Sequence, residues 1–316
     1  HLTQFIFKLI KKTMEEIMVK IVESIPNFSE GRNQEVIDGL VAVAKSVPGV
    51  TLLDHSSDTS HNRSVFTLVG DENSIQEVSF QLVKYASENI DMTKHHGEHP
   101  RMGATDVLPF VPIKDITIEE CVEISKKVAE RIYNELKIPS FLYEDSASRP
   151  ERKNLAKVRK GQFEGMPEKL LEEDWAPDYG ERKIHPTAGI TAIGARMPLV
   201  AYNVNLDTDN LEIANKIAKI IRGSSGGYKY CKAIGVMLEG RNIAQVSINM
   251  VNLPKFPLYR VFETIRFEAQ RYGVGILGSE VVGLAPAKAL IDAAEYYLQI
   301  EDFDYDKQVL ENHLLG

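Results

Sequence analysis

The order in which strands and helices follow one another is the feature of this sequence that most constrains its fold. From residue 19 onward, short runs rich in β-branched residues alternate with longer runs whose apolar side chains recur every three or four positions. The first pattern predicts strands and the second predicts amphipathic helices. The expected elements are strand 19–24, helix 33–46, strands 50–54 and 63–70, helix 73–88, strand 107–113, helix 117–136 and strand 140–143.

The order strand, helix, strand, strand, helix, strand recurs in the second half of the chain. Two such βαββαβ units predict an α+β protein with two ferredoxin-like subdomains, each an antiparallel or mixed sheet with helices on one face. We expect a substrate groove between the two subdomains. The expected elements of the second unit are strand 199–206, helix 211–222, strands 233–238 and 243–251, a helix after Pro257 and a closing strand at 274–278.

Domain boundaries follow from this repeat. We place an N-terminal, catalytic subdomain at residues 18–196, a C-terminal subdomain at 197–298 and a tail at 299–316. Residues 1–17 are expected to be a non-native extension, with the natural start at Met18.

The composition favours small-molecule chemistry over nucleic-acid binding. The 316 residues carry a formal net charge of -8, so the chain lacks the basic character that binding to a phosphate backbone needs. An early apolar run, residues 5–10, is too short to span a membrane or to form the core of a signal peptide. The two cysteines, Cys121 and Cys231, form no disulfide or metal-binding pattern. We therefore expect a cytoplasmic protein with small-molecule substrates and with neither nucleic-acid nor membrane partners.

Residues 94–103 (KHHGEHPRMG) hold the densest cluster of titratable groups in the chain. The glycines and the proline within this run predict a tight loop, and loops on a rigid scaffold often carry catalytic residues. A histidine titrates near neutral pH, so one imidazole can accept a proton and later return it. The run therefore predicts an acid–base histidine.

The neighbouring side chains allow more than one role. Glu98 could orient an imidazole or raise its basicity, or it could form an ion pair with Arg101. Arg101 could instead bind a substrate carboxylate through its guanidinium group. His95 and His96 are expected to be solvated loop residues. A zinc site made by His95 and His99 is disfavoured because a third ligand and the helical His-Glu-x-x-His motif are missing, so no metal is predicted.

Three other stretches stand out by composition. Residues 54–63 (DHSSDTSHNR) are expected to form a hairpin loop, although as a group they could line a polar pocket. Residues 149–160 are rich in lysine and arginine and are expected to form a solvated helix face, with attraction of a polyanionic substrate as the functional alternative. Residues 144–196 have weak periodicity, but their aromatic side chains favour an ordered segment.

Three motifs give the sequence a resemblance to a known family. Residues 22–31 (VESIPNFSEG), 96–104 (HGEHPRMGA) and 174–180 (DWAPDYG) resemble the glutamate formiminotransferase family, and the likeness runs from Met18 to about residue 298. The resemblance implies transfer of a formimino group between N-formimino-L-glutamate and tetrahydrofolate, giving 5-formiminotetrahydrofolate and L-glutamate, in histidine degradation. It implies tetrahydrofolate as co-substrate and His99 as the catalytic proton acceptor. Supporting roles are considered for Glu98, Arg101, Asn27 and Asp58.

The resemblance also maps a folate-binding loop onto this chain. Gly180, Pro186 and Gly189 match the family pattern, whereas the five residues after Gly180 depart from it. The family further implies a homodimer, and the product would pass to a separate cyclodeaminase because no such domain is evident in this sequence. The loop comprises Gly180, Glu181, Arg182, Lys183, Ile184, His185, Pro186, Thr187, Ala188 and Gly189.

Two alternatives remain open. The first is transfer of a formyl group between N-formylglutamate and 5-formyltetrahydrofolate, because sequence does not separate C=NH from C=O at one atom. The second is a non-catalytic module that binds folate or an amino acid, since a fold by itself does not determine function.

Overall fold

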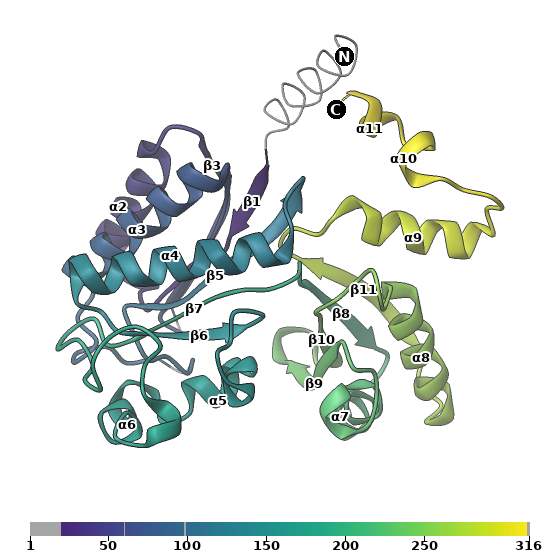
Figure 1. Ribbon diagram of the computed structural model, residues 1–316. Helices are drawn as coiled ribbons and strands as arrows, with labels where there is room; N and C mark the ends of the chain where they lie inside the picture. Colours follow the sequence, from purple (N-terminus) through teal and green to yellow (C-terminus); the bar gives the residue numbers. More distant parts are fainter. Residues whose placement is uncertain (1–19, 60, 98, 315–316) are drawn as a thin grey trace, which may run out of the picture. The chain divides into compact units, whose positions relative to one another are not determined.

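The computed structural model describes residues 20–59, 61–97 and 99–314 of the chain (Figure 1). These residues form two compact units that divide after Arg196. The extension expected at residues 1–17 lies outside the described residues. Within the described part of the chain, no helix combines the length and the apolar character needed to cross a lipid bilayer.

The first unit is built on a seven-stranded sheet whose core has the ferredoxin-like strand order. β1 and β2 each pair with both β4 and β5, so they act as one strand interrupted at Ile25 and Pro26. With β3 beside β4, the order is β3, β4, β1/β2, β5, and all these pairings are antiparallel. The strands are β1 (Ile21–Ser24), β2 (Asn27–Phe28), β3 (Val50–Asp58), β4 (Arg63–Gly70) and β5 (Thr105–Lys114).

Two parallel strands extend this sheet beyond β5. β7 (Thr191–Ala195) pairs with β5 and with β6 (Ser140–Glu144), parallel in both cases. The strand at β6 was predicted, but β7 was not. Its sequence, TAIGA, is short and rich in small residues, and all five residues are buried, so it shows none of the alternation that marks a half-exposed strand.

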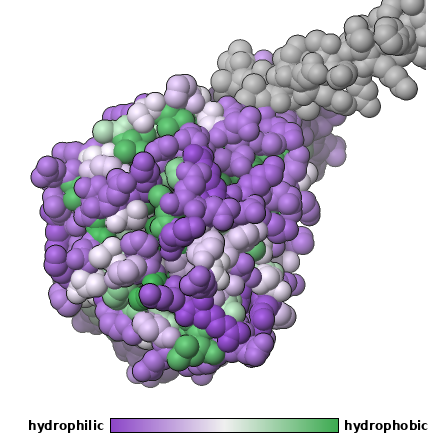
Figure 2. All heavy atoms as spheres, turned by 60° about the vertical axis from the view of Figure 1, so that its left-hand side comes forward, coloured by the Kyte–Doolittle hydropathy of each residue, from purple (hydrophilic) through white to green (hydrophobic). Residues whose placement is uncertain are grey.

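Helices α2 (Gln34–Ser46), α3 (Glu72–Asn89) and α4 (Ile118–Leu136) cover one face of this sheet (Figure 1). Their first turns are capped by side chains of Asn33, Asp71 and Thr117, and Thr117 forms the predicted capping box with Glu120. The face of this unit shown in Figure 2 is mainly hydrophilic, as expected for helices that bury only one apolar stripe.

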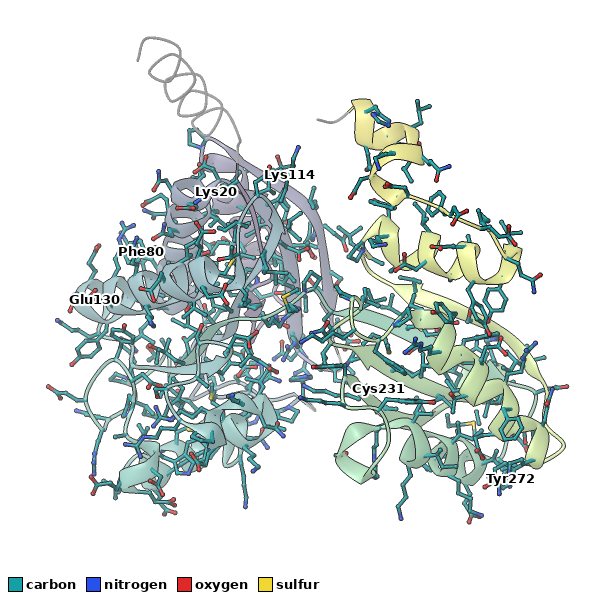
Figure 3. The ribbon with its side chains drawn as sticks, turned by 45° about the vertical axis from the view of Figure 1, so that its right-hand side comes forward. Lys20, Phe80, Lys114, Glu130, Cys231 and Tyr272 are labelled. Atoms are coloured by element: carbon teal, nitrogen blue, oxygen red, sulfur yellow. The ribbon has the colours of Figure 1, made fainter. Side chains whose placement is uncertain are left out.

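Lys20, labelled in Figure 3, joins two of these helices to the start of the sheet. Its Nζ lies 2.8 Å from Glu72 Oε1 and 2.5 Å from Glu120 Oε1, and these carboxylates belong to the first turns of α3 and α4. The three side chains are each about two-fifths exposed, so solvent screening limits what the pairs add to stability.

The second unit has the ferredoxin-like topology, followed by three C-terminal helices. Its four strands are all antiparallel in the order β11, β8, β10, β9, and α7 and α8 contribute the apolar side chains that pack on the sheet. The elements are β8 (Val200–Leu206), α7 (Leu211–Ile221), η3 (Gly223–Ser225), β9 (Cys231–Leu238), η4 (Glu239–Arg241), β10 (Ile243–Met250), α8 (Leu258–Arg271) and β11 (Ile276–Val282), followed by α9 (Ala287–Leu298), α10 (Tyr305–Gln308) and α11 (Leu310–Leu314). The predicted α+β class with two ferredoxin-like subdomains is confirmed.

The closing strand was placed too early in the sequence. The prediction was 274–278, whereas β11 runs to Val282 and starts only at Ile276. Gly273 has a left-handed backbone with φ of 68°, and the turn it forms carries the chain through the next two residues before pairing begins.

The weakly periodic segment 144–196 is ordered and packs on the sheet face opposite to α2, α3 and α4. Phe141 and Tyr143 of β6 point into a small core with Val158 and Met166, whereas Leu142 between them points into the main core. Besides the end of β6 and all of β7, which belong to the sheet, the segment contains η1 (Pro150–Lys153), α5 (Leu155–Arg159), α6 (Gln162–Lys169) and η2 (Glu173–Trp175).

Arg152 contradicts the expectation that the basic stretch 149–160 is solvated. It is 1% exposed, its Nη1 donates to Asp178 Oδ2 at 2.5 Å, and its Nη2 donates to the carbonyl oxygens of Asp174 and Ala176. The side chain thus holds the DWAPD segment against β6. Other members of the stretch, such as Lys153, are exposed as expected.

We expect Arg152→Met to lower the free energy of unfolding of the first unit by about 3–5 kcal/mol, because it leaves a buried carboxylate without its cation. Urea unfolding followed by the fluorescence of Trp175 measures this directly, since Trp175 is the only tryptophan in the chain and lies in the same segment.

Arg149→Met is the matched control. Arg149 is 40% exposed and pairs with the exposed carboxylate of Asp174, so its replacement should cost less than about 1 kcal/mol. Equal losses for the two variants would contradict the role given to Arg152.

Candidate active site

His99 lies in the loop between α3 and β5, at the centre of a hydrogen-bonded cluster of polar side chains. Nη1 of Arg63, the first residue of β4, lies 2.7 Å from Nδ1 of His99. The other terminal nitrogen of Arg63 donates to Oδ1 of Asn27 in β2, and Asn27 is itself held by the carbonyl oxygen of Ile25. The structure therefore brings the predicted residues His99 and Asn27 together through an arginine to which no individual role had been given.

The Nδ1 atom of His99 has two competing partners. The carbonyl oxygen of Pro100 lies 2.6 Å from it, while Arg63 lies 2.7 Å away. An arginine can only donate and a carbonyl can only accept, so one tautomer satisfies only one of them. When Nδ1 carries the proton and donates to Pro100, the other ring nitrogen, Nε2, is free to accept a proton. This is the tautomer that can act as a base.

The surroundings of His99 strongly disfavour its charged form. Burial and the nearby guanidinium groups of Arg63 and Arg159 lower the pKa of His99 to about 4, and the Pro100 carbonyl and Asp106 only partly oppose them. Burial also lowers the pKa of Arg63 to about 10, which still leaves it cationic at neutral pH. His99 is therefore a neutral imidazole next to two fixed positive charges.

Asp106 holds these two arginines. Its carboxylate is 1% exposed; Oδ2 lies 2.6 Å from Arg159 Nη2 and 3.4 Å from Arg63 Nη1, and Oδ1 accepts from the backbone N–H of Met102 at 3.0 Å. Asp106 and Arg159 were not singled out from the sequence. Arg159 is part of the basic stretch, but nothing in its local pattern distinguishes it from the exposed lysines beside it.

Arg101 occupies a different position from the one expected of a substrate ligand. Its guanidinium group makes a bidentate pair with Glu164 at 2.6 and 2.9 Å, and further donors go to Gln162 and to His95. The side chain is 8% exposed. This geometry favours a clamp between the His99 loop and α6 over a role in binding a substrate carboxylate.

The expectation that His95 is solvated is wrong, whereas His96 is exposed as expected. His95 is 7% exposed; Nε2 donates to the carbonyl oxygen of Asn62 at 2.9 Å, and Nδ1 accepts from Arg101 at 3.1 Å. Both ring nitrogens are therefore engaged by protein groups. Among the described residues, no three potential ligands are gathered as a metal site would require.

The polar run 54–63 is a strand for half of its length, which corrects the expected loop. β3 continues to Asp58, paired residue by residue with β4, and only the residues after it turn. Asp58 accepts from the backbone N–H of His61 at 2.7 Å, and the ring of His61 lies 6.1 Å from that of His99. Asp58 is thus linked to the site through His61. Glu98 lies outside the described residues.

The loop 180–189 is hydrogen-bonded to the backbone that follows His99. Ala104 N–H donates to the carbonyl oxygen of Ala188 at 2.9 Å, and Gly103 forms a β-bridge with Gly189. Gly189 has φ of 71°, and a Cβ there would lie 2.3 Å from the carbonyl oxygen of Met102, so only glycine fits. The end of the loop is therefore part of the same rigid unit as the catalytic candidate.

The side chains of this loop divide into two groups. His185 accepts from the backbone N–H of Ala188 at 3.0 Å, which closes the turn, and burial lowers its pKa. Glu181, Arg182 and Lys183 are exposed, and Arg182 donates to the carbonyl oxygen of Leu171 at 3.4 Å. The remaining loop members are Gly180, Ile184, Pro186 and Thr187, of which Ile184 packs on the small core.

Titration of the histidines by NMR should give a pKa near 4 for His99, and Arg63→Met should raise it because one neighbouring cation is removed. Since the folded-state pKa lies below the ordinary value of 6.5, His99 favours the folded state above pH 6.5 and this contribution is lost as the pH falls toward 4. The NMR signals that disappear in the His99→Gln variant are those of His99.

Lys94→Met is the control for that titration. Lys94 is 83% exposed in the same loop, so removing its charge should leave the pKa of His99 almost unchanged. An equal shift in both variants would rule out a specific effect of Arg63.

Comparison with known proteins finds relatives of one family along both units of the chain. The N-terminal subdomain of the formiminotransferase domain matches residues 21–196, and the formiminotransferase domain matches residues 201–312. A glutamate formimidoyltransferase of Streptococcus pyogenes serotype M1 is 84% identical over 95% of this chain and 100% of that protein. One of Thermoplasma acidophilum is 45% identical over 94% and 98%, and the formimidoyltransferase-cyclodeaminase of Mus musculus is 43% identical over 90% of this chain and 53% of that protein. The chain belongs to the formiminotransferase family.

Proposed function

We propose that this protein is a glutamate formimidoyltransferase that moves the formimino group between N-formimino-L-glutamate and tetrahydrofolate, with His99 as the acid–base catalyst. The observation that carries the proposal is the 84% identity to a glutamate formimidoyltransferase along nearly the whole chain. The geometry of the site supports it, because a neutral, half-buried imidazole is available beside cations suited to a substrate with two carboxylates.

The chemistry needs one group that first accepts and then donates a proton. N5 of tetrahydrofolate attacks the formimino carbon and forms a tetrahedral intermediate, while Nε2 of His99 takes the proton that N5 loses. The same proton passes to the glutamate nitrogen as its bond to carbon breaks, and the C=N bond re-forms on the folate. With Nδ1 donating to the Pro100 carbonyl, the imidazole keeps one orientation through both transfers.

Tetrahydrofolate is assigned to the loop 180–189. Support comes from the hydrogen bond between Ala104 and Ala188, which links that loop to the segment next to His99, and from the glycine required at residue 189. The exposed Arg182 and Lys183 give the loop positive charge where an anionic folate tail would pass.

The wider setting rests on the family resemblance. A place in histidine degradation and a homodimeric state follow from it by analogy. A cytoplasmic location is supported by Cys121 and Cys231, which are both free and buried, as suits a reducing compartment.

We expect His99→Gln to reduce turnover by about 100- to 10,000-fold while the protein stays folded, because the proton acceptor is lost. Formation of 5-formiminotetrahydrofolate in a steady-state assay measures the loss. His96→Gln is the control, since His96 is the exposed histidine of the same loop, and it should retain activity close to that of the unaltered protein. Near-normal turnover of the His99 variant would refute the assignment.

We also expect kcat/KM to be at least about 100-fold higher for N-formimino-L-glutamate than for N-formyl-L-glutamate. A site that accepts a hydrogen bond from the formimino N–H faces the formyl oxygen with an unmatched lone pair. Competition between the two donors measures the ratio. A preference for the formyl donor would favour the alternative reaction, and binding of folate without turnover of either donor would indicate a binding module.

A further inference from the structure

Arg159 is a largely buried arginine that shares its partner among the described residues, Asp106, with Arg63. Its side chain is 13% exposed, and the described residues offer no hydrogen-bond acceptor to Nε or Nη2. Nε and Nη2 are fully buried, although Nη2 lies 2.6 Å from Asp106 Oδ2 in a geometry that does not make a hydrogen bond. Because Nη2 already faces Asp106, an incoming carboxylate would be bound through the other terminal nitrogen, Nη1.

The charges around Arg159 do not balance in the described part of the chain. Arg63 and Arg159 are both cationic and share a single carboxylate, Asp106. His99 adds no negative charge and is neutral at pH 7. One positive charge is therefore left over in a partly buried cluster, where an anion would be bound strongly.

The backbone of Arg159 is held in place by Lys169. Arg159 is the last residue of α5, and the ammonium group of Lys169 donates to three carbonyl oxygens at the end of that helix, those of Lys157, Val158 and Lys160, at 2.7 to 3.0 Å. Lys169 also lies 3.8 Å from the centre of the Trp175 ring. Burial lowers the pKa of Lys169 to about 8. The backbone that carries Arg159 is thus fixed before any ligand arrives.

We propose that Arg159, with Arg63 beside it, binds the α-carboxylate of the glutamate substrate next to His99. This inference rests on the proposed function and names the residues that hold one of its substrates. The amino-acid donor and the glutamate tail of a folate both carry an α-carboxylate, and we assign the site to the donor.

The choice of the α-carboxylate follows from the structure of the substrate. The formimino carbon is bonded to the α-nitrogen, and the carboxylate carbon lies only about 2.5 Å from that nitrogen, by standard bond lengths. The side-chain carboxylate is farther away by two methylene groups. Arg63 contacts the His99 ring directly, and Arg159 shares Asp106 with Arg63, so a carboxylate held by these cations places the α-nitrogen beside the imidazole.

Carboxylate binding also changes the acid–base properties of the histidine. The groups that face His99 are Arg63, Arg159, Asp106, the Pro100 carbonyl and the ring of His61. A bound carboxylate cancels one of the two positive charges that disfavour the imidazolium, so the proton affinity of His99 rises when the substrate is in place. Glutamate would thus prepare the catalyst for the proton transfer.

The test compares binding of L-glutamate with binding of its α-monoamide, L-isoglutamine, to the intact protein. Calorimetry should show that L-isoglutamine, which lacks the α-carboxylate, binds about 10- to 100-fold more weakly than L-glutamate. Arg159→Gln should weaken glutamate binding by a similar factor and should remove the preference for glutamate over isoglutamine. Lys157→Gln, which removes an exposed charge from the same helix, should change neither value. An unchanged preference in Arg159→Gln would overturn the proposal.

Kinetics separates the two possible sources of the carboxylate. In Arg159→Gln the KM for N-formimino-L-glutamate should rise, and the rise should be the same with tetrahydropteroate, which has no glutamate tail, as acceptor. A rise only in the KM for tetrahydrofolate would overturn the assignment to the donor. Absence of formimino transfer in the unaltered protein would refute the proposed function. The calorimetric test of the carboxylate site would still be valid, because it measures glutamate binding without turnover.

A measurement without any variant covers the case in which Arg159→Gln does not fold. In the unaltered protein, NMR titration should show that saturating L-glutamate raises the pKa of His99 by about one unit or more, since it adds a negative charge close to the ring. L-Isoglutamine should leave the pKa unchanged. No rise with glutamate, or an equal rise with both ligands, would contradict the proposal.

Discussion

The geometry of the site depends on the contacts of the Asp106 carboxylate with two arginines and one backbone N–H group. This carboxylate is almost fully buried, and burying a charge is unfavourable unless cations and N–H donors surround it. Arg63 from β4, Arg159 from α5 and the backbone of Met102 meet this need. The chain between His99 and β5, the strand β4 and the segment beyond β6 are thereby brought to one point.

The two faces of the first sheet are covered by different parts of the chain and contribute differently to the site. One face is covered by α2, α3 and α4, and this packing provides most of the apolar core. The opposite face carries the segment 144–196, which supplies Arg159 from one end and the loop 180–189 from the other. A regular βαββαβ unit has no equivalent of this segment. The extension of the sheet by β6 and β7 therefore adds the residues that complete the candidate site.

The neutrality of His99 in the unliganded protein fits its position between two guanidinium groups. A base with such a low proton affinity would be weak if it worked alone, because efficient proton transfer needs a pKa nearer to the working pH. A carboxylate bound at Arg159 supplies the missing negative charge. Substrate binding and activation of the catalyst would then be one electrostatic event.

The sequence alone determined the βαββαβ order within both units, the capping box at Thr117 and the loop that carries His99, because each depends on local periodicity or on a short motif. It did not reveal β7, the burial of His95 and Arg152, or the engagement of Arg101 by Glu164. It also gave no sign that Arg159 differs from its exposed neighbours. These features depend on side chains that are distant in the chain and meet only when the sheet is assembled, so the tertiary structure decided them.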